Sequence, residues 1–541
     1  MDTNAFEKAL ETVNKLGEQY LFDEARTALL ELAEHASSDP ARLLNIADTF
    51  ESLGLVSDAE YFAHKTINAA SNTDPAALII KKMMLYLLGH IAAQVCDQDI
   101  CDKIGRSLLS MFPNDQEVLI YLIRHQSYNP KANPAMQKTL AEYWAQTVAI
   151  AHRPRPMATP LAGRKLRVGY VSGDLSMHPV GLFIHGVLLA HDRSRFELFT
   201  YNANPRKSDP LEQLIRKITC MRDVAGIHDD QLDSMIREDA IDVLVDLSGF
   251  TTNTRLAVFA REPAPVLISW LGYWATTGLS CLDGFLLDKW HAYSGCEADY
   301  TEPVIQMPCL RFCYQPLFDV AVNETPPCLT NGFITFGCFN TTCKINSKVL
   351  DVWAEILQCI PDSHLFLKWK TLNDQKLRER FRTAFARRGI DPKRIIFSGW
   401  SSLATMFEEC SAKVDIALDP FPFPGGITTC NALWMGIPVV TLSGETAISR
   451  QGEAILSQLD LQDLVARNEQ DYIHIACGLA QTPKLLSELR KNLRSMMNES
   501  PLRDVAGFTR HLETIFLALY TKRLLSPPTR ERYRTPVQVC I

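Results

Sequence analysis

The sequence predicts an α/β protein in which an all-α region precedes two doubly wound lobes with parallel sheets. The chain has 541 residues, and a single hydrophobic core stops growing at roughly 250–300 residues, so several domains are expected. The first part of the chain shows only helical patterns, whereas short β-rich runs alternate with helical segments from Leu166 onward. Such alternation indicates parallel sheets covered by helices. Two series of β-rich runs follow each other, and we expect a cleft between them. The first series is LRVGYVS, FELFTYNA, IDVLVDLSG and VLISWLGY, and the second is FITFGCFN, SHLFLKWK, RIIFSGW, VDIALDPF and IPVVTL.

The composition is that of an ordinary globular protein and narrows the classes of function. Hydrophobic residues make up 47% and charged residues 22% of the chain, which indicates neither a disordered nor a collagen-like protein. The net charge of −7 excludes a protein that coats nucleic acid, so we expect no nucleic-acid partner. Metal is not expected either, because the pairs Cys96/Cys101 and Cys309/Cys313 have no His or second Cys pair at zinc spacing.

Cysteine usage and the apolar runs favour a cytoplasmic protein. The 15 cysteines have no framework of spacings, and the opening MDTNAFEKALETV lacks a basic segment followed by an apolar one. Both features favour a reducing compartment. The longest apolar run, residues 78–93, contains Lys81 and Lys82 and is shorter than the ~20 residues that span a bilayer. We therefore expect a core helix there and no membrane span.

Residues 1–126 are predicted to form tetratricopeptide-like helical repeats. Pro40 and Pro75 close two similar units 35 residues apart, and Ala25 and Ala59, in matching acidic turns, are 34 residues apart. Paired helices at this period stack because neither can bury its apolar face alone. A plain helical bundle is the alternative.

The remaining domain limits follow from changes of pattern along the chain. Residues 127–164 form a linker with one helix, at about Met136 to Ala151. Residues 165–318 are predicted to form the first lobe and residues 328–520 the second. Residues 525–541 have little apolar content and are predicted to be a mobile tail.

The segment DPFPFPGGITTCNALWMGIP is the strongest candidate for a phosphate site. A strand at Val414 to Leu418 leads through a stiff turn and two glycines into a helix at Thr428 to Met435. The start of a helix offers unpaired amide donors and a partial positive charge. With the hydroxyls of Thr428 and Thr429, it can hold a pyrophosphate without lysine or metal, and ligands of parallel sheets bind at the carboxyl ends of strands. A threonine-capped structural helix is the alternative.

A histidine follows the first strand of the first lobe. The strand Leu166 to Val171 leads through Asp174 to His178 and Pro179 at the start of a helix. A histidine there faces the cleft, where it can donate to a phosphate or take a proton near neutral pH. The alternative role is that of a helix cap.

Two further segments carry candidate residues. The strand Phe333 to Phe339 ends at Asn340, and Lys344 follows in the loop, where it can neutralise a leaving diphosphate; an ordinary surface lysine is the alternative. In the first lobe, the strand VLISW opens into a loop with candidate acceptor contacts, which turn capping explains equally well. These contacts are Tyr273, Thr276 and Thr277.

Seven segments of the chain resemble, in the same order, those of one known family. They are GYVSGDLSMHPVG, DLSGFTTNTRL, REPAPVLISWLGYWATTG, FGCFN with the following Lys344, LDPFPFPGG, ALWMGIPVVTL and GETAISR. The chain is similar over residues 160–520 to the protein O-GlcNAc transferase and SPINDLY-like proteins, glycosyltransferase family 41, particularly to bacterial members with tetratricopeptide N-termini. The resemblance implies a GT-B fold of two Rossmann-like lobes and an inverting, metal-independent transfer of a sugar from a nucleotide donor to a protein side chain. It implies no cofactor beyond the nucleotide sugar, and repeats that present the acceptor. The first lobe, residues 165–318, is then the acceptor side, and the second, residues 328–520, is the donor side.

The resemblance also assigns roles to individual residues. His178 corresponds to a residue beside the donor phosphate and the acceptor, with Asp174 on the acceptor side, and Lys344 to the residue that neutralises the leaving diphosphate. The turn at Gly425, Gly426, Ile427, Thr428 and Thr429 corresponds to the diphosphate site, and Asn340 lies on the donor side.

Three donor-side positions depart from the family pattern. Thr341 replaces an amide side chain, and Phe407 replaces a histidine against the uracil, keeping a flat face for stacking but losing a hydrogen bond. Asn431 stands where an acid binds the ribose hydroxyls, which removes a charge-assisted acceptor about twice as strong as a neutral one. Phe250, where a histidine is common, is a milder difference.

The sequence therefore favours transfer of a sugar from UDP-GlcNAc or a related UDP-hexose to Ser or Thr of a protein. One alternative is a protein glycosyltransferase with another donor or acceptor, such as a CMP-nonulosonic acid to flagellin or UDP-glucose to Asn. The other is a repeat scaffold with an inactive transferase lobe. The sequence gives neither the sugar, the acceptor, the general base nor the oligomeric state.

Overall fold

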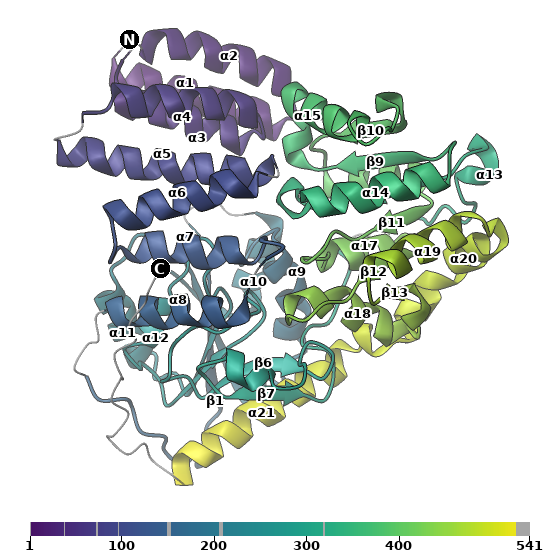
Figure 1. Ribbon diagram of the computed structural model, residues 1–541. Coiled ribbons are helices and arrows are strands. Elements are labelled where there is room, and N and C mark those ends of the chain that lie inside the picture. Colours follow the sequence, from purple (N-terminus) through teal and green to yellow (C-terminus); the bar gives the residue numbers. More distant parts are fainter. Residues whose placement is uncertain are drawn as a thin grey trace. The chain divides into compact units, whose positions relative to one another are not determined.

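The computed structural model (Figure 1) describes residues 2–36, 38–71, 74–95, 97–131, 133–148, 153–204, 209–317 and 320–525. The tail expected from residue 525 onward, apart from Leu525, lies outside these residues, as does Cys96. The described chain divides into two compact units. Unit 1 comprises Met1–Pro113, Val320–Leu442 and Asp463–Arg494, and unit 2 comprises Asn114–Asp319, Ser443–Gln462 and Ser495–Ile541. Each unit is described by itself.

The N-terminal part of the chain is all-α, as the sequence predicts. Its helices are α1 Thr3–Glu18, α2 Phe22–Ala36, α3 Pro40–Ser52, α4 Val56–Ala69, α5 Pro75–Gln94, α6 Gln98–Met111, α7 Gln116–Gln126 and α8 Pro134–Thr147. Pro40 and Pro75 begin α3 and α5, each preceded by an aspartate whose side chain accepts an N–H of the first turn. Proline suits this position because its missing N–H would have no partner there. The two prolines thus start helix pairs rather than close them.

The repeats bury small residues where their helices meet. Ala25 of α2 and Ala59 of α4, the matching positions of the predicted repeat, are both fully buried. Among the described residues, α5 is the one helix long and apolar enough to cross a membrane by length and composition alone. It packs against both α4 and α6, and core helices of folded proteins often meet the same two criteria.

Unit 2 contains a seven-stranded parallel sheet. Its strands are β1 Leu166–Ser172, β2 Phe196–Asn202, β3 Cys220–Asp223, β4 Val243–Asp246, β5 Val266–Ser269, β6 Gly284–Asp288 and β7 Val304–Met307. Their order is β3-β2-β1-β4-β5-β6-β7, with Val168 beside Val243 in the register of β1 and β4. The accompanying helices are α9 Pro179–Ala190, α10 Pro210–Ile218, α11 Asp229–Glu238, α12 Leu256–Phe259, α18 Gln451–Leu456 and α21 Val505–Leu525.

Unit 1 contains a six-stranded parallel sheet. Its strands are β8 Thr335–Cys338, β9 His364–Lys368, β10 Ile395–Ser398, β11 Ile416–Leu418, β12 Val439–Leu442 and β13 Val465–Ala466, in the order β10-β9-β8-β11-β12-β13. The helices in this part of the chain are α13 Cys328–Asn331, α14 Ser347–Cys359, α15 Gln375–Ala386, α16 Leu403–Lys413, α17 Ile427–Trp434, α19 Glu469–Ala480 and α20 Pro483–Glu499. Two 3-10 turns are used below, η2 Thr342–Lys344 and η3 Lys370–Asn373.

Both sheets have the doubly wound order, and each therefore has a switch point where the strand order reverses. In unit 1 this point lies between β8 and β11, which pair in parallel, and their carboxyl ends lead to Asn340 and Asp419. In unit 2 it lies between β1 and β4, and β1 leads to Asp174. Ligands of open α/β sheets bind beyond the carboxyl ends of strands at such points.

The compact units divide the chain differently from the predicted domains. Helices α1–α6 belong to the same unit as the second sheet, and α7 and α8 belong to the unit of the first sheet. The limits at residues 126 and 164 mark changes of sequence pattern, and they stay predictions. The helix expected at about Met136 to Ala151 is α8, which begins at Pro134 and ends at Thr147.

Candidate functional site

The strand β11 and the helix α17 carry a turn, Asp419 to Thr429, that we call the glycine turn. Asp419 holds it together from inside. The buried Asp419 carboxylate accepts hydrogen bonds from the Gly425 N–H at 3.1 Å and from the Thr429 hydroxyl at 3.0 Å, and the Tyr472 hydroxyl donates to the Asp419 carbonyl at 2.9 Å. A Cβ on Gly425 would overlap the hydroxyls of Thr428 and Thr429. The position therefore requires glycine.

The helix α17 begins directly on this turn. Gly426 is its N-cap, and no side chain caps its first turn. The first amides of a helix have no partner within the helix and carry partial positive charge. Ile427, Thr428 and Thr429 thus bring amides and two hydroxyls to the carboxyl end of β11.

Lys344 lies against the glycine turn. Its Nζ donates to Asn340 Oδ1 at 3.1 Å and to the Pro424 carbonyl at 2.9 Å, and it lies 3.9 Å from the centroid of the Phe423 ring, a cation–π contact. The Thr428 hydroxyl donates to the same Asn340 Oδ1 at 3.0 Å. Asn340 therefore joins the lysine to the start of α17, and the predicted residues from two distant segments converge within unit 1.

The electrostatics of Lys344 suit an anion. Burial lowers the pKa of Lys344 to about 8, against the effect of the Asp419 carboxylate, which raises it. Burial also raises the pKa of Asp419, against its hydrogen bonds with Gly425 and Thr429 and the charge of Lys344. A bound anion would stabilise the ammonium form of Lys344, because it supplies a charge partner where burial has removed water.

In unit 2, His178 is the N-cap of α9. Its Nδ1 accepts the Val180 N–H at 3.3 Å and lies 3.7 Å from Asp174 Oδ1, while its side chain is 43% exposed. Acceptance at Nδ1 puts the proton of the neutral ring on Nε2. His178 is thus a helix cap, as the alternative held, and it keeps an exposed ring.

The three residues of the loop after β5 are buried. The Tyr273 hydroxyl accepts from Gln137 Nε2 of α8 at 2.7 Å. The Thr276 hydroxyl donates to Glu302 at 2.6 Å, and the Thr277 N–H donates to the same carboxylate at 2.8 Å. All three side chains are at most 1% exposed. The Thr276 and Thr277 hydroxyls also accept the Gly278 and Leu279 N–H groups, which is the turn capping of the alternative. We assign none of the three residues an acceptor contact.

Comparison with known proteins decides the family. The family described as Glycosyl transferase family 41 matches residues 106–315 and 324–512. The chain belongs to this family. The resemblance inferred from the seven segments is confirmed, and the chain is placed among the glycosyltransferases.

Two relatives match about two thirds of the family 41 chain. A probable UDP-N-acetylglucosamine–peptide N-acetylglucosaminyltransferase SPINDLY of Petunia hybrida is 36% identical over 363 residues, 66% of this chain and 39% of that protein. The SPINDLY protein of Arabidopsis thaliana is 34% identical over 66% of this chain and 40% of its own length. The chain therefore spans about two fifths of the length of these relatives.

A solved structure matches nearly the whole chain. A lysine-to-methionine variant of an O-GlcNAc transferase of Thermobaculum terrenum is 29% identical, with a TM-score of 0.84, over 97% of this chain and 99% of that chain. The predicted fold class, two Rossmann-like lobes of the GT-B type after an all-α region, is confirmed.

The three departures from the family 41 pattern lie in different surroundings. Asn431 lies on α17, 7% exposed, two residues beyond the glycine turn. The Thr341 hydroxyl is 3.4 Å from Gln94 Oε1 of α5. Phe407 of α16 is 3% exposed, so its ring offers little free face for stacking on a base in this conformation.

Asp419 and Asn346 of the site, and Gln94 of α5, were not singled out from the sequence. Asp419 is the hub of the glycine turn, and the signal for it was an acid directly after a buried strand. Asn346, at the N-cap of α14, donates to the Phe421 carbonyl at 2.6 Å and holds the first part of the turn. Gln94 has no local signal for its contacts with Thr341 and Thr342, because these two residues lie 247 and 248 positions away in the sequence.

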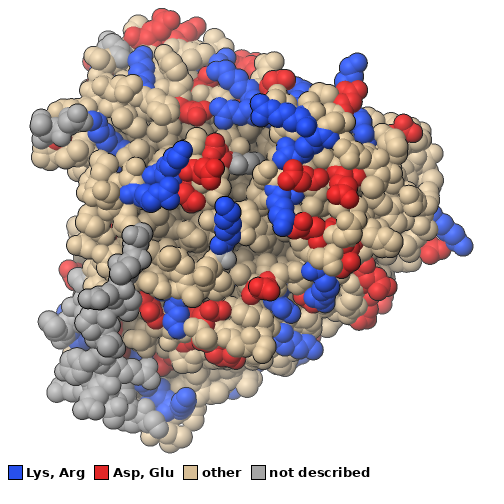
Figure 2. Space-filling view, in the orientation of Figure 1, with Lys and Arg blue, Asp and Glu red and all other residues tan. Residues whose placement is uncertain are grey.

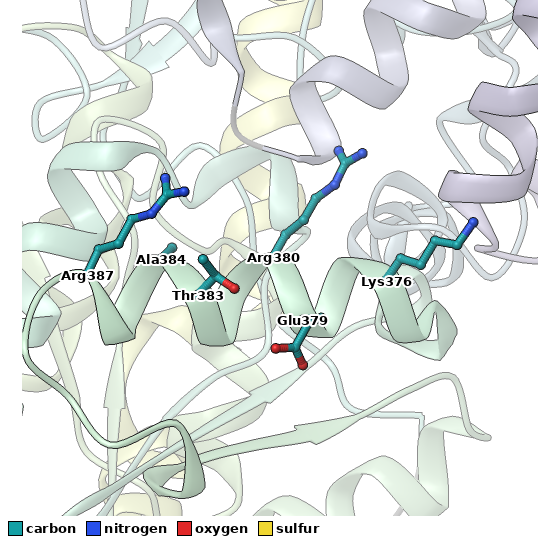
Figure 3. Close-up of a pocket in the computed structure, with 6 residues that line it drawn as sticks. All are labelled: Lys376, Glu379, Arg380, Thr383, Ala384 and Arg387. Carbon is teal, nitrogen blue, oxygen red and sulfur yellow. The ribbon is translucent and has the colours of Figure 1, made fainter.

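A separate groove of about 450 Å³ runs along α15. Lys376, Arg380 and Arg387 extend from one side of the helix, and Glu379 points the other way (Figure 3). Lys and Arg side chains also gather over α15 in the surface view (Figure 2). None of the residues that line the groove belongs to the glycine turn, so we do not count it as part of the candidate site.

Proposed function

We propose that this family 41 chain is a cytoplasmic, inverting, metal-independent glycosyltransferase that moves a sugar from a nucleotide donor to Ser or Thr of a protein. The observation that carries the proposal is the meeting of the Lys344 ammonium with the start of α17 through Asn340. UDP-GlcNAc or a related UDP-hexose is the favoured donor, and the names of the SPINDLY relatives support it. Because the chain spans about 39% of those relatives, its acceptors are proposed independently of theirs, with the N-terminal repeats presenting them.

In the proposed reaction, an acceptor hydroxyl attacks the anomeric carbon on the face opposite the nucleotide. The new C–O bond forms as the bond to the diphosphate breaks, and the electron pair of the broken bond stays on the diphosphate oxygen. Lys344 and the amides and hydroxyls of the glycine turn stabilise that developing charge, and electrostatic stabilisation of this kind usually contributes most to catalysis. The acceptor proton leaves to a base, and His178 positions the acceptor or relays this proton.

The candidate site constrains the identity of the nucleotide sugar less than it constrains the type of reaction. Asn431 can still hydrogen-bond a ribose hydroxyl, but a neutral amide is a weaker acceptor than the acid it replaces. This single residue favours the second candidate, a protein glycosyltransferase of the same fold with another donor, such as a CMP-nonulosonic acid, or with asparagine as acceptor.

The proposal is tested by nucleotide binding and by product mass. Thermal-shift titrations of the purified chain with UDP, GDP and CMP should give the largest rise in Tm with UDP. Intact-mass analysis of proteins co-expressed with the chain should show a gain of one N-acetylhexosamine or hexose. A larger shift with CMP would select the second candidate. If no nucleotide changes the Tm and no protein gains mass, the chain is an inactive scaffold.

A further inference from the structure

Helix α4 of the repeats contacts helix α15, in the part of unit 1 that carries the six-stranded sheet, through hydrogen bonds and an ion pair. The Asp374 carboxylate, at the N-cap of α15, accepts the Ser57 N–H at 2.6 Å and the Ser57 hydroxyl at 3.0 Å. Glu60 of α4 pairs with Arg380 at 3.0 Å. Helices α1–α6 and this lobe therefore belong to one compact unit rather than to two domains joined by a linker.

One of these contacts reaches the segment that carries Lys344. Gln94 is the last residue of α5 and is 3% exposed. Its Oε1 accepts the Thr342 hydroxyl at 2.6 Å and is 3.4 Å from the Thr341 hydroxyl. Thr342 is fully buried, two residues before Lys344 in the turn η2, and its hydroxyl is 3.0 Å from that of Thr371 in η3.

The other end of the Gln94 amide is held as well. Its Nε2 lies 3.2 Å from His90 Nε2, one helical turn earlier on α5. An amide nitrogen only donates and an amide oxygen only accepts. With the nitrogen on His90, the oxygen of Gln94 faces the two threonines.

The turn η2 needs such support from outside. It is a three-residue 3-10 turn, closed by the Lys344 N–H to the Thr341 carbonyl at 3.1 Å, and 3-10 hydrogen bonds have poorer geometry than those of an α-helix. The direction in which Lys344 leaves the turn sets whether its Nζ reaches both Asn340 and Pro424.

We propose that Gln94 is a positioning residue for Lys344, so that the last helical turn of α5 is a working part of the donor site. The inference rests on the proposed role of Lys344 in sugar transfer. Gln94 acts through the Thr342 hydroxyl, which fixes η2. Loss of this bond shifts the ammonium relative to the glycine turn, and misplacement of a catalytic group by 1 Å can lower turnover by about 100-fold.

The test uses the full chain with Gln94→Leu, which keeps the side chain's approximate size and removes the hydrogen bonds of its amide to His90, Thr341 and Thr342. We expect kcat of sugar transfer to fall about 10- to 100-fold, with a smaller change in the KM for the donor. The matched control is Gln98→Leu, because Gln98 bonds to Asp102 within α6 at 3.3 Å and its loss should leave both constants unchanged. An unchanged kcat in Gln94→Leu would overturn the proposal.

A double-mutant cycle separates positioning from packing. If Gln94 acts through Thr342, then Gln94→Leu combined with Thr342→Val should lower kcat no more than the stronger single variant, whereas independent effects would multiply. Thr342→Ser keeps the hydroxyl and should restore most of the kcat lost in Thr342→Val. Multiplying effects, or no rescue by serine, would contradict the mechanism.

A readout without substrate keeps this inference distinct from the proposed function. Hydrogen exchange of the nucleotide-free protein should become faster in Gln94→Leu at residues 340–346, and remain unchanged in β9, β10 and unit 2. If the wild-type chain transfers no sugar, the proposed function fails. The exchange measurement still shows whether the contact of Gln94 with Thr342 holds residues 340–346 in place. Unchanged exchange at residues 340–346 would overturn the structural role of Gln94.

Discussion

At the scale of single residues, Lys344 combines three features that suit a diphosphate. Two oxygens hold its ammonium in place and the Phe423 ring lies beneath it, so little conformational freedom remains to be lost on binding. An ammonium has three N–H donors, and a phosphate oxygen can accept from the third. Burial has already removed much of the water that would compete for it.

Replacement of Lys344 by alanine should lower turnover by about 100- to 1,000-fold, the usual loss for one stabilising group in a transition state. The fold should persist, as judged by circular dichroism. The control is Lys348→Ala, because Lys348 is exposed on α14 and pairs with Glu469. Turnover within threefold of the wild type would remove Lys344 from the mechanism.

The pH dependence of transfer should report the lysine directly. Burial lowers the pKa of Lys344 to about 8; the ammonium is charged below this pH and neutral above it. We therefore expect kcat/KM for the donor, which reports the free enzyme, to fall as the pH rises through about 8. In Lys344→Arg any remaining activity should lack this alkaline fall, because a guanidinium stays charged. A profile that is flat to pH 10 in the wild type would contradict the assignment.

At the scale of elements, the glycine turn joins β11 to α17 without room for an added side chain. Gly425 lies among the Thr428 and Thr429 hydroxyls and Asp419 Oδ1. The same hydroxyls are candidate ligands for a diphosphate, so the geometry of the turn and the affinity for nucleotide are linked.

Gly425→Ala should weaken UDP binding at least about tenfold, because the new methyl group displaces the two threonine hydroxyls, and a loss of 1.4 kcal/mol is tenfold in affinity. Isothermal titration calorimetry measures it. Gly478→Ala in α19 is the control, since nothing in the described chain lies within 4 Å of its added Cβ. Equal affinities in the two variants would mean that the turn does not bind nucleotide.

At the scale of the whole molecule, unit 1 is assembled from segments far apart in the chain. Gly54, in the turn between α3 and α4, has φ +77° and meets the second lobe so closely that an added Cβ would lie 2.6 Å from the Lys370 carbonyl. Lys370 begins η3, which also holds Thr371, the partner of Thr342. The repeats are thus connected to the candidate site through backbone as well as through Gln94.

Gly54→Ala should therefore lower the free energy of unfolding by more than the strain of a positive φ would lower it alone. Gly332→Ala is the matched control, because Gly332 has φ +78° and no described atom within 4 Å of its added Cβ. We expect a loss of about 1 kcal/mol for Gly332→Ala and about 2–4 kcal/mol for Gly54→Ala, measured by urea unfolding. Equal losses would show that the close approach to Lys370 contributes nothing.

Much of the fold could be predicted from the sequence because the helices and strands follow from the spacing of residue types along neighbouring positions. The strands β1, β2, β4 and β5 and the strands β8 to β12 fall in the β-rich runs, and the glycine turn and Lys344 follow strand ends. The strands β3, β6, β7 and β13 were missed. β3 is short, with mostly polar and exposed residues, and β13 has only two residues, so neither leaves an apolar run.

The sequence by itself determined the all-α region, the two parallel sheets, the family and the residue types at the glycine turn, since periodicity and motif order depend only on neighbours along the chain. Tertiary structure alone decided which candidates meet. It joined Lys344 to Thr428 through Asn340, buried Tyr273, Thr276 and Thr277 in loop contacts, and brought Gln94 to the lysine's turn. Burial and hydrogen bonding between distant segments arise only when the chain has folded, so no local pattern records them.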